Sequence, residues 1–345
     1  MSSSMASGGA PCVSVVIPAF NAEADIEIAI RSAQAQTLSD LEVIVIDDAS
    51  TDSTASLVEA LAAQDSRITL LRNPANIGQA ASRNRGLMAA RGDWIAILDA
   101  DDSFEPARLS VLLELGLNGE ADIVSDNPLL WFPATGATRP AIPDSKLAVA
   151  HEMGFREFID GCHYDGRAPR RSSYVFMHPM FRRAFMQRNG LLYDPRCRNG
   201  EDFILYLDCL AAGARWFITP ETLYRYTVRD GSLTEVIRDT DRSLMIGKIV
   251  EVGKLPHVAA DGALHRAVMR HHRLMREAHY YEIVKAHVKA GRAGDVLRLF
   301  RQDHAAPSIV GRELIARAPR IGRTFARRLT RKVTQFTSAR LTSGR

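Results

Sequence analysis

The chain has only four cysteines among its 345 residues, and none of them lies in a CxxC spacing or beside a histidine cluster. This scarcity excludes the common structural zinc sites and is typical of a reducing cytoplasm. No stretch approaches the roughly 18 to 20 uncharged apolar residues that span a bilayer. Residues 1–11 are rich in Ser, Ala and Gly and lack the basic and apolar segments of a secretory signal, so we expect a disordered lead-in there.

Acidic residues are almost missing from one end of the chain. Residues 312–345 carry ten Lys and Arg but one acid, a charge of +9, whereas residues 1–311 carry −5 within the total of +4. Apolar residues at helical spacing in residues 314–336 predict an amphipathic helix that could lie on an anionic membrane surface. The alternative is a helix that packs on the protein body. Poor aromatic interleaving argues against a nucleic-acid partner.

Short apolar runs recur in the first third of the chain, with helical patterns between them. They predict strands at Val13–Ile17, Glu42–Ile46, Ile68–Leu71, Trp94–Leu98 and Asp122–Ser125. Strands that alternate with helices predict βαβ units and a mostly parallel sheet, so the fold class is α/β. The first three runs are continuously apolar, as expected for strands that are covered on both faces. Mostly helical segments follow from residue 264 to residue 300.

Three carboxylates, Asp99, Asp101 and Asp102, directly follow the predicted strand Trp94–Leu98. The carboxyl ends of parallel strands open on the crevice where α/β sheets hold ligands. Acids so close together repel one another unless a cation lies among them, and Mg²⁺ and Mn²⁺ bind carboxylate oxygens together with water and phosphates. The motif therefore predicts a site for Mn²⁺ or Mg²⁺ and a diphosphate. The alternative is a solvated acidic turn before the next helix, with Pro106 near its first turn.

A glycine-rich turn is missing after the first predicted strand, which ends in the residues Pro-Ala-Phe-Asn at positions 18–21. This absence argues against NAD binding, and a Walker A loop is absent too. The second strand ends at Asp48, which we expect at the same edge of the sheet. Asp48 could accept hydrogen bonds from a base or a ribose. The alternative role, capping of the following helix, can already be filled by Asp52.

Four sequence blocks together resemble the inverting family 2 glycosyltransferases of the GT-A fold. They are VSVVIPAFNAEADIEIAIRSAQAQT, VIVIDDASTDST, NPANIGQAASRNRG and GDWIAILDADD, in the order and spacing of the family over roughly residues 11–125. The wider architecture is similar to bacterial exopolysaccharide glucosyltransferases of the succinoglycan type. The resemblance implies a GT-A domain that binds a UDP-sugar and a divalent metal, followed here by a helical C-terminal region.

The resemblance also implies a nucleotide-sugar pocket. Its residues would be Pro18, Ala19, Phe20, Asn21, Asp48, Arg83, Asp99, Ala100, Asp102 and Arg229. Asp48 would read the uracil, Asp99 would contact the ribose, and Asp101 would bind the metal that bridges the diphosphate. Arg83 would face the base or the phosphates, or else form a salt bridge on a helix surface. Arg229 would bind a phosphate.

An acid pair, Glu201-Asp202, begins an apolar helix. Such acids are favoured at a helix N-terminus by the helix dipole alone. The family resemblance implies instead that the pair supplies the general base, with Asp202 as our first choice and Glu201 as the second. Direct displacement at the anomeric carbon requires the acceptor hydroxyl to lose a proton. A base on one face and a metal-bound diphosphate on the other give inversion, so a UDP-α-sugar would yield a β-linkage.

Two further residues are candidates for the acceptor side. His178, in the segment HPMFRR, could touch the donor or the acceptor, or it could be a buried structural histidine. Trp131 could stack on acceptor sugars or belong to the core.

These observations divide the chain into five parts. We expect a lead-in at 1–11, a nucleotide-sugar-binding half at 12–125, an acceptor-binding and catalytic half at 126–235, a helical extension at 236–308 and a basic amphipathic tail at 309–345. The expected protein is an inverting transferase, cytoplasmic and peripheral on the inner membrane, that moves a sugar such as glucose to a lipid-linked or surface glycan. The alternatives are a nucleotidyltransferase, whose phosphate loop is missing here, and a non-catalytic nucleotide- or glycan-binding scaffold. The sequence sets no expectation for the oligomeric state.

Overall fold

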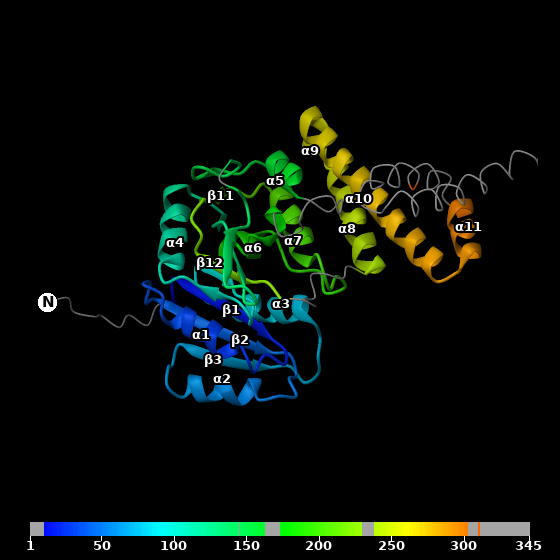
Figure 1. Ribbon diagram of the computed structural model, residues 1–345. Helices are drawn as coiled ribbons and strands as arrows, with labels where there is room; N and C mark the ends of the chain where they lie inside the picture. The colour runs from blue at the N-terminus through cyan, green and yellow to red at the C-terminus, as the bar shows by residue number, and fades with distance from the viewer. Residues whose placement is uncertain (1–9, 144, 163–172, 230–237, 303–309, 311–345) are drawn as a thin grey trace, which may run out of the picture.

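The computed structural model describes residues 10–143, 145–162, 173–229, 238–302 and Val310. These residues form a layered α/β domain with a helical extension that leads away from it (Figure 1). The predicted amphipathic helix of the basic tail lies outside the described residues. Residues 230–237 lie outside them as well.

An eight-stranded sheet in the order β3-β2-β1-β4-β10-β6-β11-β9 forms the centre of the domain. Its strands are β1 Val13–Ala19, β2 Leu41–Asp47, β3 Ile68–Arg72, β4 Trp94–Ile97, β6 Ile123–Ser125, β9 His151–Glu152, β10 Met180–Arg182 and β11 Trp216–Ile218. The first four strands pair in parallel, as do β6 and β11. Strands β10 and β9 run antiparallel to their neighbours. The predicted α/β class and mostly parallel sheet are confirmed, and the antiparallel insertion of β10 between β4 and β6 is an addition to them.

Alternate side chains of each central strand pack into opposite layers. Val16 of β1 belongs to one apolar cluster, whereas Val15 and Ile17 belong to the other. The first cluster includes side chains from α3 and α7, and the second includes side chains from α1, α2 and α4. These helices are α1 Ile26–Gln34, α2 Thr54–Ala62, α3 Gln79–Ala89, α4 Arg108–Asn118 and α7 Glu201–Ala211. Burial on both faces explains the continuous apolar runs of the strands.

A smaller sheet in the order β5-β12-β7-β8 begins directly after the acidic turn. Its strands are β5 Ser103–Phe104, β7 Leu129–Phe132, β8 Ala137–Pro140 and β12 Tyr224–Thr227. In its register Tyr224 pairs with Phe104. This pairing brings a late segment of the chain against the residues that follow Asp102.

The remaining helices follow β9 in the chain and continue into the C-terminal extension. They are α5 Phe155–Gly161, the 3₁₀ helix η2 Tyr174–Phe176, α6 Arg183–Arg188, α8 Asp239–Gly253, α9 Pro256–Ala260, α10 Gly262–Lys289 and α11 Ala293–Gln302. The side chain of Asp261 caps α10 by accepting from the backbone N–H groups of Ala263 and Leu264. The long α10 then leads away from the sheet towards α11 (Figure 1), which confirms the predicted helical character of this region. Among the described residues, no helix combines the length and apolarity needed to cross a bilayer.

The close packing of α3 on the sheet can be tested with one methyl group at Gly86. A Cβ atom there would overlap Cγ1 of Val16 and lie 2.8 Å from Cδ1 of Ile46. We expect Gly86→Ala to lower the free energy of unfolding by about 1 to 3 kcal/mol in urea titrations, because overpacking shifts the neighbours. Gly247 in α8 is the matched control, since its added Cβ would meet no atom within 4 Å. Gly247→Ala should stabilise by about 0.5 to 1 kcal/mol, and equal effects at both positions would contradict this packing.

Candidate active site

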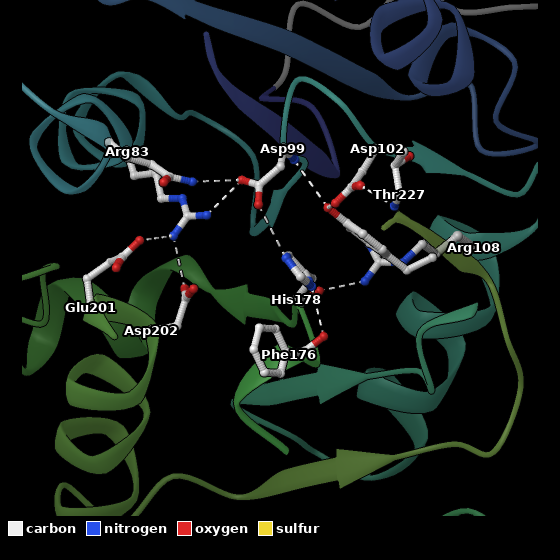
Figure 2. A network of polar contacts seen from close by, with 11 residues as sticks. Arg83, Asp99, Asp102, Arg108, Phe176, His178, Glu201, Asp202 and Thr227 are labelled. Carbon is white, nitrogen blue, oxygen red and sulfur yellow. Dashed lines mark hydrogen bonds and ion pairs between the residues drawn. The ribbon is translucent and has the colours of Figure 1, made fainter. Parts of the chain in front are cut away.

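A buried arginine joins the acidic turn after β4 to the beginning of α7 (Figure 2). Arg83 of α3 is only 1% exposed. Its Nη2 donates to Oδ1 of Asp99 at 2.7 Å, and its Nη1 donates to Oε1 of Glu201 at 3.1 Å and to Oδ1 of Asp202 at 3.0 Å. The alternative of a surface salt bridge is therefore wrong. Because both terminal nitrogens are bound to carboxylates, a contact of Arg83 with a base or with phosphates stays a prediction.

Local backbone geometry fixes the acid pair in front of Arg83. Gly200, the residue before α7, has φ +102°, and a Cβ there would lie 2.5 Å from Sδ of Met245. The positive φ therefore favours glycine at this position, and a Cβ atom would also push the Met245 side chain aside. On the other side, the Asn84 amide donates to Tyr193 O and accepts from Tyr193 N, each at 2.8 Å. These bonds dock the segment that leads to α7 onto the helix that carries Arg83.

The two acids of the pair differ in exposure. The side chain of Glu201 is 6% exposed and that of Asp202 is 22% exposed. Burial raises the pKa of Glu201 to about 8, and the negative charge of Asp202 adds to this shift while Arg83 opposes it. The raised pKa favours the neutral form of Glu201, against the charge of Arg83 beside it. Asp202 is the carboxylate of the pair that solvent and a bound ligand can reach.

The acidic turn forms a compact cluster with His178. Ligand atoms of Asp99, Asp102 and His178 all lie within 4.8 Å of one another, which is close enough to hold a metal ion. Nε2 of His178 lies 3.4 Å from Oδ2 of Asp99. Asp101, the predicted metal ligand, is on the exposed side of the same turn. Its role as a ligand stays a prediction, and Asp99, Asp102 and His178 are the residues whose donor atoms converge.

Asp99 and Asp102 have opposite electrostatic surroundings. Burial alone would raise the pKa of Asp99, but the charge of Arg83 and the contact with His178 hold it below its usual range. Burial and the negative charges of Asp101 and Asp99 raise the pKa of Asp102 well above its usual range. Asp102 accepts from the Tyr224 hydroxyl and from a backbone N–H of β12, each at 2.7 Å. A cation beside these acids would therefore relieve a repulsion that the protein alone does not neutralise.

The ends of β1 and β2 lie together, as the sequence predicts, but Asp48 is already engaged. Its Oδ1 accepts from Asn73 Nδ2 at 2.8 Å and from Ile77 N at 2.9 Å, and its Oδ2 accepts from Gly78 N at 2.8 Å. Asp48 thus fixes the loop that leads into α3. Its predicted reading of uracil would have to use the remaining acceptor capacity of Oδ2.

Residues of the neighbouring turn are arranged around Asp48. Ala19 O accepts from the Asp48 backbone N–H at 2.8 Å, and Asn21, at φ +49°, accepts from Thr51 N at 2.9 Å. Phe20 between them is 49% exposed. An exposed ring at this edge has no core to fill, which is compatible with its predicted place near a base.

Two predicted residues make their direct side-chain contacts outside the acidic cluster, although the charge of Arg229 also acts on Asp101 and Asp102. Arg229 donates to Asp25, just before α1, with 2.7 Å between Nη1 and Oδ2. Trp131 of β7 is half-buried, and the guanidinium of Arg225 lies 5.9 Å from its ring centre. Neither arrangement tests the predicted phosphate or acceptor contacts. Pro18 lies within β1, and Ala100 lies buried beside Asp99.

Two structural members of the site were not predicted from the sequence. Arg108 is fully buried, donates to Asp126 Oδ1 and to the backbone O of His178, and lies over the rings of Phe104 and Tyr224. Tyr224 supplies the hydroxyl group that Asp102 accepts. A charged residue in a helix usually predicts a surface position, so no sequence pattern pointed to Arg108.

Comparisons with known proteins show the family to which the chain belongs. The family model for glycosyl transferase family 2 matches residues 14–178. Succinoglycan biosynthesis protein ExoO of Rhizobium meliloti (strain 1021) is 32% identical over 91% of this chain and 88% of its own. Succinoglycan biosynthesis protein ExoU of the same organism is 33% identical over 77% of this chain and 75% of its own.

Two solved structures are similar in fold. TarS 1–349 of S. aureus in complex with UDP-GlcNAc matches 88% of this chain and 80% of its own, with a TM-score of 0.61 and 18% identity. Mannosyltransferase PcManGT from Pyrobaculum calidifontis, in complex with GDP-Man and Mn²⁺, matches 98% and 89%, with a TM-score of 0.53 and 18% identity. The fold is thus that of the GT-A transferases. The chain belongs to glycosyltransferase family 2.

The buried proton on Glu201 should be visible in the pH dependence of stability. Its folded-state pKa of about 8 lies above its ordinary value of 4.5. Between these values the folded protein binds more protons than the unfolded chain, so the free energy of unfolding falls as pH rises. Gln imitates the neutral acid, so Glu201→Gln should remove this part of the fall. Urea unfolding at about pH 5 and about pH 7.5 should show the variant gaining on the wild type as pH rises.

Glu59→Gln is the matched control, because the Glu59 side chain on α2 is 60% exposed. We expect its stability relative to the wild type to stay constant over the same pH range. A pH-independent difference for Glu201→Gln as well would contradict a protonated Glu201.

Proposed function

We propose that the protein transfers a sugar, with inversion, from a UDP-sugar to a hydroxyl group of a glycan during bacterial exopolysaccharide synthesis. The observation that carries this proposal is the link through Arg83 between an accessible carboxylate, Asp202, and the acidic turn at Asp99. Similarity to two proteins named for succinoglycan biosynthesis supports the pathway class. The likeness of the fold to a transferase in complex with UDP-GlcNAc is compatible with a UDP-sugar donor. By resemblance to glucosyltransferases, we propose UDP-glucose.

The acidic turn would hold Mn²⁺ or Mg²⁺ in this proposal. The donor set fits a divalent ion, because carboxylates and an imidazole converge and one carboxyl group is held under strong repulsion. When bound, the ion would neutralise the negative charge of the leaving diphosphate. Asp99, Asp101 and Asp102 are the acids proposed for this part of the site. Phe20, Asn21, Asp48 and Arg229 are proposed for the nucleotide.

Asp202 is the proposed general base. It would take the proton of the acceptor hydroxyl as the oxygen attacks the anomeric carbon. Arg83 binds only Oδ1 of Asp202, according to the contact at 3.0 Å, so the carboxylate is oriented without both oxygens being used by this arginine. Glu201 would stay neutral and leave the role of proton acceptor to Asp202.

The proposals for the acceptor and the location do not rest on the described residues. We propose a lipid-linked or surface glycan acceptor, approached at the cytoplasmic face of the inner membrane. The basic tail from residue 309 would bind the anionic lipid surface, since residues 312–345 carry +9. His178 and Trp131 were expected on the acceptor side, and Trp131 keeps that proposed role.

Asp202→Asn separates an enzyme from a nucleotide-binding scaffold. With UDP-glucose, Mn²⁺ and a bacterial lipid extract, we expect UDP release to fall by about 10²-fold or more, because the hydroxyl loses its base. UDP affinity, measured by calorimetry, should stay within about threefold, a change of under 1 kcal/mol. The measurement should be repeated with UDP-galactose and UDP-GlcNAc to identify the donor.

Asp208→Asn is the matched control on the same helix. Asp208 pairs with Lys248 at 3.1 Å, a contact with no part in the acidic cluster, so turnover should be unchanged. Full turnover in Asp202→Asn would remove Asp202 as the base. No UDP release by the wild-type protein from any of the three donors would favour the scaffold.

A further inference from the structure

His178 faces the acidic turn from the opposite side of the cluster (Figure 2). It lies just before β10, the antiparallel strand between β4 and β6. The side chain is buried, and its Nε2 is 3.4 Å from Oδ2 of Asp99. The insertion of β10 therefore places the imidazole nitrogen of His178 beside the carboxylate oxygens of the acidic turn, which are neighbours in the sequence.

The hydrogen bond at the other ring nitrogen defines which nitrogen faces the acids. Nδ1 lies 2.8 Å from the carbonyl oxygen of Phe176. A carbonyl oxygen can only accept, so Nδ1 carries a proton. Without a cation, Nε2 acts as a donor towards Oδ2 of Asp99, and a bound cation would replace this proton so that the lone pair faces the metal. Histidines that bind metals typically have this arrangement, with the second nitrogen donating to a carbonyl or carboxylate.

The ring and the backbone of His178 are both held in place. The residue has φ +43°, an uncommon conformation for a side chain with a Cβ atom. Its ring stacks on Tyr224 at 4.2 Å between centroids and 17° between planes, and its carbonyl accepts from Arg108 Nη2 at 2.6 Å. Uncommon backbone conformations of this kind gather at ligand sites, where the surroundings enforce them.

We propose that Nε2 of His178 is a ligand of the divalent ion, together with carboxylate oxygens of Asp99 and Asp102, and that it makes the site prefer Mn²⁺ over Mg²⁺. The inference rests on the proposed function only in assuming that this cluster binds a divalent ion with the nucleotide. Mg²⁺ prefers oxygen ligands and retains its waters, whereas imidazole is a good ligand for transition metals. The nitrogen donor therefore sets the preference, because carboxylates serve both ions.

Pulsed electron paramagnetic resonance of the full chain with Mn²⁺ and UDP tests the bond directly. A bound imidazole couples the manganese spin to a nitrogen nucleus, so protein labelled with ¹⁵N-histidine should give a spectrum different from that of unlabelled protein. An identical spectrum in both samples would overturn the inference while leaving the metal site intact. Absence of any bound Mn²⁺ would overturn both the inference and the metal-dependent part of the proposed function.

A substitution measures the preference between ions. His178→Asn should lower Mn²⁺ affinity by about tenfold or more and abolish the nitrogen coupling, with a much smaller effect on Mg²⁺. Asn is suitable because it tolerates positive φ, and a thermal melt checks that the variant folds. His151→Asn is the matched control, since His151 also contacts a carbonyl and a carboxylate, Val149 O at 3.0 Å and Glu157 at 2.9 Å. Equal loss of Mn²⁺ and Mg²⁺ in His178→Asn, or equal loss of Mn²⁺ in both variants, would overturn the proposed selectivity.

Discussion

The buried guanidinium of Arg83 is the interaction on which the rest of the site depends. It is held among Asp99, Glu201 and Asp202, and it is the contact through which the acidic turn and the acid pair meet. Removing one partner of such a buried ion pair typically costs about 3 to 5 kcal/mol, because the other charge is left without compensation. The position of Arg83 on α3 is in turn fixed by the packing of that helix on β1 and β2. The core and the site therefore constrain each other.

The acids of the site lie in different electrostatic surroundings. Burial raises the pKa of Glu201, Arg83 and His178 lower the pKa of Asp99, and burial with the charges of Asp101 and Asp99 raises the pKa of Asp102. Carboxyl groups with different proton affinities in one site can fill different chemical roles. In the proposed mechanism, the same arrangement would give one accessible acid for proton transfer and one group of acids for a cation.

Much of the fold could be predicted from the sequence, because βαβ units leave apolar runs at regular spacing. The strand at Trp94–Ile97 and the acids that follow it were found in this way. β10 was harder to predict, since three residues give no clear periodicity. The convergence of Arg83 with an acid 118 positions away is a property of the tertiary fold, and family resemblance alone pointed to both partners. The sequence did not indicate that Arg108 and Tyr224 are buried, because a local pattern does not show which polar side chains the fold encloses.

The central claim is that the acidic turn binds the metal–diphosphate unit while Arg83 holds the base in place. Anomalous diffraction at the manganese edge from crystals grown with UDP and Mn²⁺ tests it most directly. The account predicts one manganese peak between the acidic turn, His178 and the UDP phosphates, with Arg83 still bound to both Asp99 and Asp202. A manganese peak remote from Asp99 and Asp102, or an Arg83 side chain turned away from Asp202 towards the phosphates, would contradict it.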